Sequence, residues 1–224
     1  MYNMNSCRKI VITADGSSTV FNPQLNQHYH SIHGAMQESQ HVFMKMGLFS
    51  TTPERTSILE IGFGTGLNAF LVLLETQEPA SDRSVLYTSL EAFPLKQEEL
   101  AGLNYAQNET EKELFQKLHD AEWNKEVSLN ENFILHKIQT KLEDFVADEN
   151  TYGLIFFDAF SPEAQPELWT EEIFRKLFLS VKPGGILVTY CAKGQVRRNM
   201  QAAGFKVERL QGPPGKREML RAGK

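Results

Sequence analysis

The amino-acid sequence predicts an α/β fold in which helices cover both faces of a mainly parallel, doubly wound sheet. Two observations predict it. From residue 57 onward, short apolar strand patterns alternate with amphipathic helical patterns, as in successive β–α units. The stretch ILEIGFGTGLNAFL, residues 58–71, places three glycines between an apolar strand and the helix that follows it.

The chain of 224 residues is interpreted as one domain, because it holds no internal repeat, no low-complexity tract and no linker. Within this single domain (1–224), residues 1–57 are expected to form a hairpin and helix elaboration. Residues 58–224 are expected to form a Rossmann-like, cofactor-binding core.

The predicted elements follow from the local patterns. A small N-terminal hairpin pairs residues 9–13 with 19–23 across a turn at Asp15 and Gly16, and a helix runs from about Ile32 to Met46. Strands are then predicted at 57–62, 84–92, 133–140, 152–160 and 186–192. Helices are predicted at 66–77, 95–103, 109–123, 142–148, 170–181 and 194–204. A final antiparallel hairpin pairs 205–210 with 217–222.

The net charge of −5 argues against a protein that binds nucleic acid with its whole surface. Residues 193–224, however, carry nine Lys and Arg and two Glu, a balance of +7 that leaves −12 on the rest of the chain. This asymmetry predicts a basic face of the kind that binds phosphate backbones. A C-terminal helix and hairpin whose charges are only solvated would explain the balance equally well.

The sequence shows no sign of a membrane segment or a metal site. It opens without a long apolar core, and no apolar run approaches the roughly 20 residues that span a bilayer, so a cytoplasmic protein is expected. Cys7 and Cys191 match no metal or redox spacing and are expected to be reduced thiols. His28, His30 and His33 lie close together, but their spacing fits no zinc motif, so packing and a substrate-side role are the alternatives.

The glycine-rich stretch indicates a nucleoside ligand without phosphates. A dinucleotide site needs its third glycine one position later, where Leu67 stands, and no GK[ST] follows to form a phosphate-binding loop. Glu60 precedes the glycines, and Glu91 ends the next strand, where a carboxylate can accept hydrogen bonds from both hydroxyl groups of a ribose. A glycine-rich turn that only packs closely is the alternative.

With these two acids, EIGFGTG and LEAFP resemble the cofactor-binding pattern of class I S-adenosylmethionine methyltransferases. The resemblance implies a class I Rossmann-like methyltransferase fold and S-adenosyl-L-methionine as the cofactor. The residues expected to bind it are Glu60, Gly62, Phe63, Gly64, Gly66, Asn68, Glu91 and Ala92.

Asp158 is the candidate catalytic residue. It follows a fully apolar strand, so it is expected at the strand tip that faces the ligand crevice. A primary amine acceptor, with a pKa of about 10.4, is protonated at neutral pH and must lose a proton before it can accept a methyl group. A carboxylate at this place can orient the ammonium group, take up its proton and stabilise the cation formed on transfer. Capping of the following Ser-Pro loop is the alternative.

Longer blocks carry a closer resemblance. They read DGSSTVFNPQLNQHYHSIHGAMQESQHVFMKMGL, ILEIGFGTGLNAFL, LEAFPL, FFDAFSPEAQPELWTEEIF, KPGGILVTYCAKGQVRRNMQAAGF and GPPGKREML. From about Ile12 to the C-terminus they resemble the methyltransferase domain of the bifunctional tRNA 5-methylaminomethyl-2-thiouridine biosynthesis proteins, the MnmC family. The resemblance implies methylation of the 5-aminomethyl group of the wobble (2-thio)uridine, the tRNA anticodon region as partner, and Asp158 as the acid–base residue.

The sequence departs from that family in two respects. The bifunctional proteins carry an FAD-dependent oxidoreductase domain for which 224 residues leave no room. The chain therefore resembles a stand-alone, MnmD-like form that relies on a separate enzyme for its aminomethyl substrate. Related methyltransferases also often carry Gly-Asp after the strand at 133–140, where Thr140 and Lys141 stand, so the adenine contacts are open, with Glu143 or Asp144 as possible substitutes.

On the acceptor side, Phe160 is expected to stack on the uracil ring and the C-terminal cations to contact tRNA phosphates. The residues expected to bind the substrate are Phe160, Pro162, His33, Glu38, Lys193, Arg197, Arg198, Lys216 and Arg217. Two other functions fit the same residues: methylation of a small-molecule or protein amine, and a non-catalytic tRNA-binding module on the same fold.

Overall fold

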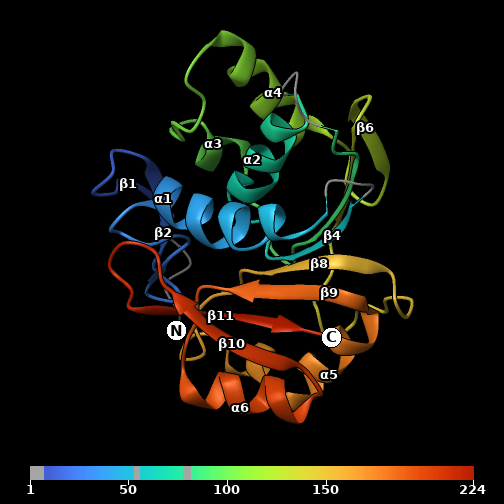
Figure 1. Ribbon diagram of the computed structural model, residues 1–224. Coiled ribbons are helices and arrows are strands. Elements are labelled where there is room, and N and C mark those ends of the chain that lie inside the picture. The colour runs from blue at the N-terminus through green and yellow to red at the C-terminus, as the bar shows by residue number, and fades with distance from the viewer. Residues whose placement is uncertain (1–7, 53–55, 78–81) are drawn as a thin grey trace.

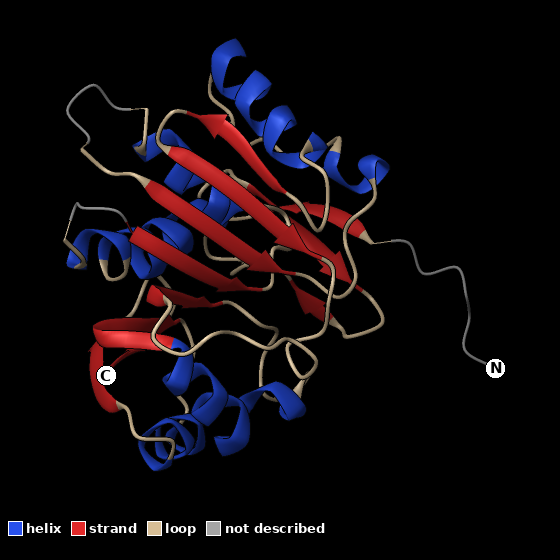
Figure 2. Cartoon of the chain, turned by 90° about the vertical axis from the view of Figure 1, so that its right-hand side faces the viewer, coloured by secondary structure: helices blue, strands red, loops and turns tan. Residues whose placement is uncertain are grey.

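The computed structural model describes residues 8–52, 56–77 and 82–224, and its centre is a twisted eight-stranded sheet with helices on both faces (Figures 1 and 2). Five strands are parallel to one another: β4 (Thr56–Ile61), β5 (Val85–Leu90), β7 (Phe133–Ile138), β8 (Tyr152–Phe157) and β9 (Val181–Thr189). The mainly parallel α/β sheet predicted from the sequence is confirmed.

Antiparallel strands complete both edges of the sheet. At one edge, β6 (Glu126–Asn130) pairs with β7, and at the other β11 (Glu218–Gly223) pairs with β9 and β10 (Lys206–Gln211). The full order is β10-β11-β9-β8-β4-β5-β7-β6. The chain runs outward from β4 through β5 to β7 and returns to β8 on the other side of β4. Strand order therefore reverses between β4 and β8, and a crevice is expected at the carboxyl ends of these two strands.

The helices form two layers. On one side of the sheet lie α5 (Glu171–Ser180) and α6 (Gly194–Ala202), seen below the sheet in Figure 1. On the other side lie α1 (Ala35–Ser39), which continues as a π-helix (Gln40–Lys45), α2 (Leu67–Glu75) and α4 (Glu109–Asp120). Shorter turns are α3 (Gln97–Leu100) and the 3-10 helices Leu48–Ser50 and Pro166–Trp169.

The two helical layers bury two apolar clusters, and β8 contributes to both. Phe156 points to one face, with its ring centroid 5.1 Å from that of Phe43, and Phe157 points to the other, 5.2 Å from Phe174. Both β8 side chains are fully buried. This accounts for the unbroken apolar run in β8, because a strand covered on both faces needs apolar residues at every position.

The N-terminal segment forms a separate three-stranded sheet of β1 (Lys9–Ile12), β2 (Ser18–Asn22) and β3 (Gln27–His28). The predicted turn at Asp15 and Gly16 is present, and it also begins α1. Asp15 Oδ2 accepts a hydrogen bond from Gln37 N at 3.0 Å, and Thr13 Oγ1 accepts one from Ala35 N at 3.3 Å. The helix therefore starts at Ala35, later than the predicted Ile32, where side chains from the hairpin satisfy its first N–H groups.

The structure differs from the sequence prediction at three other places. It contains two strands that were not predicted, β3 and β6, and the helix predicted at 142–148 is wrong. That segment makes a single turn in which Lys176 Nζ donates to the carbonyl oxygens of Leu142 and Glu143, at 3.0 and 2.7 Å. Phe145 N donates to Lys141 O at 3.1 Å, and Leu142 is buried in the apolar cluster beneath α5, so one turn of backbone hydrogen bonds and tertiary contacts hold the segment without a longer helix.

Two further findings concern the sequence expectations. Among the residues described, no helix is long and apolar enough to cross a membrane. Cys191 is a free, buried thiol, whereas Cys7 lies outside the described residues.

Replacing Phe156 by Ala should lower the free energy of unfolding by about 3–5 kcal/mol, because it leaves a cavity between Phe43 and Tyr87. Urea denaturation followed by circular dichroism measures this change. Val146→Ala, at a position 85% exposed, is the control and should change stability by less than about 0.5 kcal/mol. Equal losses in both variants would contradict the role assigned to Phe156.

Candidate active site

A cavity of about 770 Å³ opens at the carboxyl edge of the sheet. All five parallel strands end at its wall. In the order of the strands from β9 to β7, these ends contribute Tyr190, Asp158, Gly62, Glu91 and Thr140. Segments from outside the parallel core complete the wall: residues 24–32 after β2, Glu38 of α1, and Lys216 of the loop between β10 and β11. The switch point between β4 and β8 therefore lies at the centre of the cavity.

The glycine-rich loop after β4 needs its glycines for two reasons. Gly62, Gly64 and Gly66 have φ values of +92°, +52° and +75°, in the left-handed region that side chains disfavour. At Gly62, a Cβ atom would also lie 2.8 Å from the backbone carbonyl oxygen of Asp158. Gly62 and Gly64 line the cavity, whereas Gly66 is buried at the start of α2 against Leu118 and His119.

Glu91 lies next to this loop and is held by two backbone amides. Its Oε2 accepts a hydrogen bond from Gly64 N at 3.0 Å, and its Oε1 accepts one from Phe93 N at 2.9 Å. Each carboxylate oxygen retains a further lone pair for a ligand. The glycine loop and the end of β5 are thus fixed to each other with a carboxylate at the cavity wall.

The loop after β7 forms the far end of the cavity. Thr140 N donates to Glu91 O at 3.2 Å, which continues the wall from the end of β5. Residues 140–143 line the cavity, and Glu143 is among them. Asp144, the other predicted substitute at the adenine position, does not line it.

Asp158 follows β8 at the centre of the cavity and is half-buried. Its Oδ2 accepts a hydrogen bond from Asn68 Nδ2 at 2.8 Å, so α2 orients the carboxyl group. Burial, and after it the charge of Glu38, raise the pKa of Asp158, while the hydrogen bond from Asn68 and the charge of Lys216 lower it; together they bring this pKa to about 7. A carboxyl group of this kind can exchange protons near neutral pH.

Asn68 also leaves a polar atom without a partner. Within the described part of the chain, no group hydrogen-bonds to Asn68 Oδ1, although this atom is buried. Asn68 lines the cavity at the base of the glycine loop. Because this oxygen is enclosed by protein atoms, the polar contact that Asn68 makes at the cavity is the one from its Nδ2 to Asp158.

Glu60 does not line the cavity, which corrects the expectation that it contacts the cofactor directly. It is fully buried within β4, and its Oε2 accepts a hydrogen bond from Ser89 Oγ of β5 at 2.6 Å. Burial raises the pKa of Glu60 to about 8, so its carboxyl group is largely protonated at neutral pH. Through Ser89, Glu60 links β4 to β5 behind the cavity wall. Its sequence position beside the glycines could not reveal this, because neighbouring strand residues point to opposite faces.

The part of the cavity near β8 and β9 is lined by aromatic and charged side chains. The ring of Phe160 contacts that of Tyr29 edge to face, with centroids 4.9 Å apart. Tyr190 donates a hydrogen bond from its hydroxyl to Ala159 O at 2.9 Å. Glu38 and Lys216 form an ion pair at 2.5 Å in the same wall.

A buried histidine connects the N-terminal segment with the glycine loop. His30 Nε2 lies 2.8 Å from Thr65 Oγ1, and Tyr105 donates its hydroxyl hydrogen to the same oxygen at 3.1 Å. Burial lowers the pKa of His30 to about 4, which keeps the imidazole neutral at physiological pH. His30 thus fixes the loop, whereas His33 is exposed and lies against Gly215 outside the cavity.

The structure brings most of the predicted ligand-binding residues together. The predicted residues that line the cavity are Gly62, Phe63, Gly64, Asn68, Glu91, Ala92, Asp158, Phe160, Glu38 and Lys216. Those that do not are Glu60, Gly66, Pro162, His33, Lys193, Arg197, Arg198 and Arg217. Sequence reasoning left Tyr29 and Tyr190 out of the site. Tyr190 could have been found, because it ends a parallel strand as Asp158 does.

The predicted basic face is only partly free of counter-charges. Lys193 pairs with Glu163 of the loop after β8, and Lys216 pairs with Glu38 instead of pointing to solvent. Among the described residues, Arg197, Arg198 and Arg217 form no ion pair with an acidic side chain. Lys193 lies at the start of α6 and Arg217 in the β10–β11 loop, and both places are at the cavity edge of the sheet.

No group of three or more His, Cys, Asp or Glu side chains in the described ranges is arranged to hold a metal ion.

Residues 97–224, more than half of the chain, match the model of a family described as S-adenosyl-L-methionine-dependent methyltransferase.

Two curated relatives bear the name tRNA 5-methylaminomethyl-2-thiouridine biosynthesis bifunctional protein MnmC. The protein of Actinobacillus pleuropneumoniae serotype 5b (strain L20) is 31% identical over 97% of this chain and 35% of its own length. That of Cupriavidus metallidurans is 30% identical over 93% of this chain and 33% of its own length. The chain thus spans about a third of the length of these curated relatives.

Two solved structures are similar in fold. The crystal structure of MNMC2 from Aquifex aeolicus has a TM-score of 0.81 and 25% identity, covering 98% of this chain and 71% of the other. Spermidine synthase from Thermotoga maritima has a TM-score of 0.52 and 13% identity over 99% of this chain and 70% of its own. The latter likeness concerns the fold alone.

The burial of Glu60 predicts a pH-dependent effect of Glu60→Gln on stability. In the unfolded chain this carboxyl group titrates near 4.5, but in the folded protein near 8, so between these values unfolding releases a proton. As the pH rises through this interval, the free energy of unfolding of the wild type should therefore fall relative to that of Glu60→Gln, by on the order of 1 kcal/mol per pH unit.

Urea unfolding of both proteins at pH 5.5, 7 and 8 measures the difference, with Glu149→Gln at an exposed site as the control. A difference that does not change with pH would contradict a buried, protonated Glu60.

Proposed function

Because the chain belongs to the S-adenosyl-L-methionine-dependent methyltransferase family, we propose that it methylates the primary amine of the 5-aminomethyl group on the tRNA wobble (2-thio)uridine. The product is 5-methylaminomethyl-2-thiouridine, which the name of the two relatives contains. The observation that carries this proposal is the carboxyl group of Asp158, with a pKa of about 7, at the centre of a cavity that has a glycine loop on one side and aromatic rings on the other.

The residues beside β4, β5 and β7 fit the cofactor. Gly62 and Gly64 line the cavity beside Glu91, whose carboxylate can accept hydrogen bonds from the hydroxyl groups of a ribose. Glu143, which lines the cavity in the loop after β7, can contact the adenine. When bound, S-adenosyl-L-methionine supplies an electrophilic methyl group on a sulfonium centre.

Asp158 acts on the acceptor amine. The ammonium form of a primary amine, with a pKa of about 10.4, has no lone pair to offer, and transferring its proton to a carboxylate with a pKa of about 7 costs roughly 5 kcal/mol. An ordinary carboxylate would be a weaker base, so the raised pKa reduces this cost. The Asn68 amide holds the carboxylate toward the cavity, and Asp158 can stabilise the cation that forms on nitrogen during transfer.

The aromatic pair and the basic residues account for the rest of the acceptor. Phe160 and Tyr29 offer ring surfaces on which an unpaired uracil can stack, with Pro162 in the following loop close to the mouth. Lys193, Arg197, Arg198 and Arg217 lie at or near the cavity edge and can contact phosphates of the anticodon region.

Two features of organisation are part of the proposal. The N-terminal segment contributes Tyr29, His30 and Glu38 to the cavity wall, which supports treating residues 1–57 and 58–224 as one methyltransferase domain. The reaction consumes a primary amine, so another active site must make that amine before this one acts. We place the reaction in the cytoplasm with the tRNA pool.

Incubation with methyl-labelled S-adenosyl-L-methionine and tRNA from cells blocked at the aminomethyl stage tests the proposal. Label should appear in the wobble nucleoside after digestion and chromatography, and tRNA that already carries the methylated nucleoside is the control. Label in a small amine or a protein instead, or cofactor binding without any transfer, would contradict it.

Asp158→Asn should lower turnover by about 10²–10⁴-fold while leaving the affinity for S-adenosyl-L-methionine nearly unchanged, because the amide keeps the shape but cannot accept the proton. Wild-type turnover at saturating substrates should rise with pH and reach half its maximum near pH 7, where Asp158 ionises. Asp148→Asn, at an exposed loop position, is the control. Unchanged turnover in Asp158→Asn would leave Asp158 as a loop cap.

A further inference from the structure

Lys216 stands apart from the other C-terminal cations because its ammonium group lies inside the cavity. Its Nζ is 2.5 Å from Glu38 Oε1 and 3.9 Å from the centroid of the Tyr190 ring. Glu38 is only 5% exposed, and its other oxygen accepts a hydrogen bond from Ser31 N at 2.8 Å. An ammonium on the face of an aromatic ring and against a buried carboxylate is held firmly in place.

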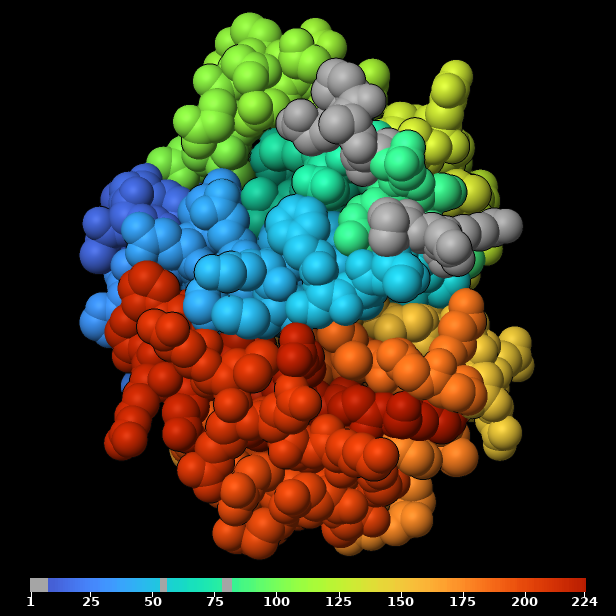
Figure 3. All heavy atoms as spheres, viewed as in Figure 1, coloured from blue at the N-terminus to red at the C-terminus, as the bar shows by residue number. Residues whose placement is uncertain are grey.

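The loop that carries Lys216 is docked on the N-terminal segment. Gly215 has a φ of +84°, and a Cβ atom there would lie 2.3 Å from His33, so only glycine allows this contact. At the start of the loop, His41 Nε2 lies 2.8 Å from Gln211 O. In Figure 3 the red C-terminal atoms lie directly against the blue N-terminal ones. Two contacts far apart in sequence thus bring Lys216 to the cavity.

Two carboxyl groups, Glu38 and Asp158, face this part of the cavity. If both were ionised with no cation near them, each would oppose the ionisation of the other. We propose that Lys216 is a positioning residue for the acceptor side: its ammonium neutralises Glu38 and thereby leaves the carboxyl group of Asp158 free to ionise and receive the proton of the acceptor amine. The effect of Lys216 on the methylation rate rests on the proposed function of Asp158. Its effect on the ionisation of Asp158 does not.

The electrostatic surroundings support this arrangement. The charge of Glu38 raises the pKa of Asp158 and that of Lys216 lowers it. The other groups that act on Asp158 and Lys216 are polar or titratable side chains from five parts of the structure. Those facing Asp158 are Glu60 of β4, Asn68 of α2, Tyr87 of β5 and Tyr190 after β9, and those facing Lys216 are His30, Tyr190 and Cys191. Of these, His30 is neutral and Glu60 largely protonated at neutral pH, so neither adds a charge beside the Glu38–Lys216 ion pair.

The proposal makes opposite predictions for the two members of the ion pair. Lys216→Met removes the cation and leaves Glu38 uncompensated, so the pKa of Asp158 should rise, by about one unit. Glu38→Gln removes the anion, keeps the acceptor for Ser31 N and leaves Lys216, so the pKa of Asp158 should fall by a similar amount. The double variant should return toward the wild-type value, and Lys216→Arg should retain it.

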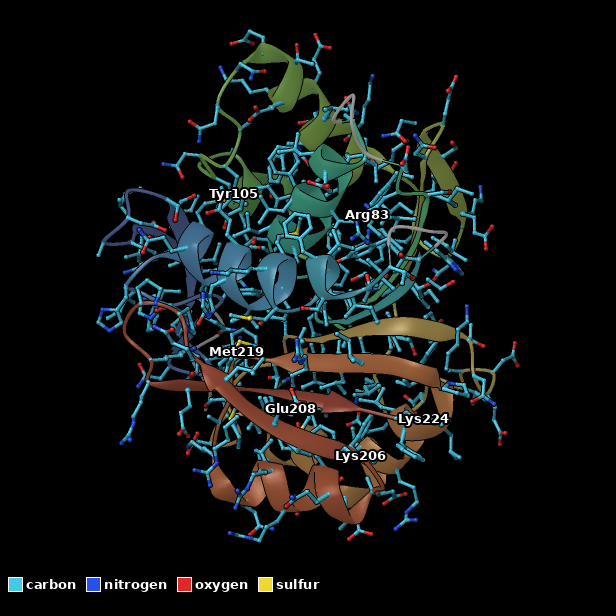
Figure 4. All side chains as sticks on the ribbon, viewed as in Figure 1. Arg83, Tyr105, Lys206, Glu208, Met219 and Lys224 are labelled. Atoms are coloured by element: carbon cyan, nitrogen blue, oxygen red, sulfur yellow. The ribbon has the colours of Figure 1, made fainter. Side chains whose placement is uncertain are left out.

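The pKa of Asp158 can be measured directly by NMR titration of protein carrying carboxyl-¹³C aspartate, with the signal assigned by its loss in Asp158→Asn. Lys206→Met is the matched control, because Lys206 lies at the other end of the same hairpin, on β10 (Figure 4). It should leave the titration of Asp158 unchanged. Shifts in the same direction for Lys216→Met and Glu38→Gln, or no shift in either, would overturn the proposal.

The pH profile of turnover then separates this proposal from the proposed function. The pH of half-maximal methylation should move upward in Lys216→Met and downward in Glu38→Gln, whereas a purely structural defect would lower the rate equally at every pH. If Asp158 titrates as expected in all variants but no variant methylates tRNA, the proposed function fails and the charge arrangement stands. If tRNA is methylated but the titration of Asp158 does not respond, the proposed function stands and the positioning by Lys216 fails.

Discussion

The site depends on the close approach of two strand ends, those of β4 and β8. Asp158 N donates to Ile61 O at 3.0 Å, and Gly62, the first residue after β4, lies so close to the Asp158 carbonyl that no Cβ atom fits between them. This contact sits where the strand order reverses. It brings the glycine loop and the carboxyl group of Asp158 to one cavity, although 96 positions of sequence separate Gly62 from Asp158. Any side chain at Gly62 would push the two halves of the site apart.

The same convergence gathers carboxyl groups, and the protein neutralises each in a different way. Glu60 is buried deepest and is kept largely protonated, with Ser89 as its donor. Asp158 is only half-buried and is held by the Asn68 amide, which leaves its pKa near neutrality. Glu38 is paired with the Lys216 ammonium and accepts a hydrogen bond from the backbone of Ser31. Since these partners come from β5, α2, the N-terminal segment and the C-terminal hairpin, the site requires both ends of the described chain to pack against the core.

The sequence predicts those parts of the molecule that depend on local patterns. Apolar strand patterns and the glycine stretch were sufficient for the parallel core, the terminal hairpin and the positions of Asp158 and Glu91. The segment 142–148 has a helical pattern but forms a single turn, in which Lys176 donates to the carbonyl oxygens of Leu142 and Glu143, and only the tertiary structure shows this contact. Lys216 illustrates the same limit: in the sequence it belongs to a basic stretch, and only the docking of Gly215 against His33 places it beside Glu38.

The two halves of the cavity have different structural origins, and this difference bears on specificity. Core loops at the ends of β4, β5 and β7 form the half beside Glu91, and a fold shared with proteins as distant as spermidine synthase is sufficient to place such loops. The other half is formed by Tyr29, Glu38 and Lys216, which lie outside the parallel core. These residues lie on the side of the cavity that we propose for the methyl acceptor, so under that proposal the choice of acceptor depends on the additions to the fold rather than on the fold itself. A change of acceptor would then require changes in the N-terminal segment and the β10–β11 loop, with the half beside Glu91 left as it is.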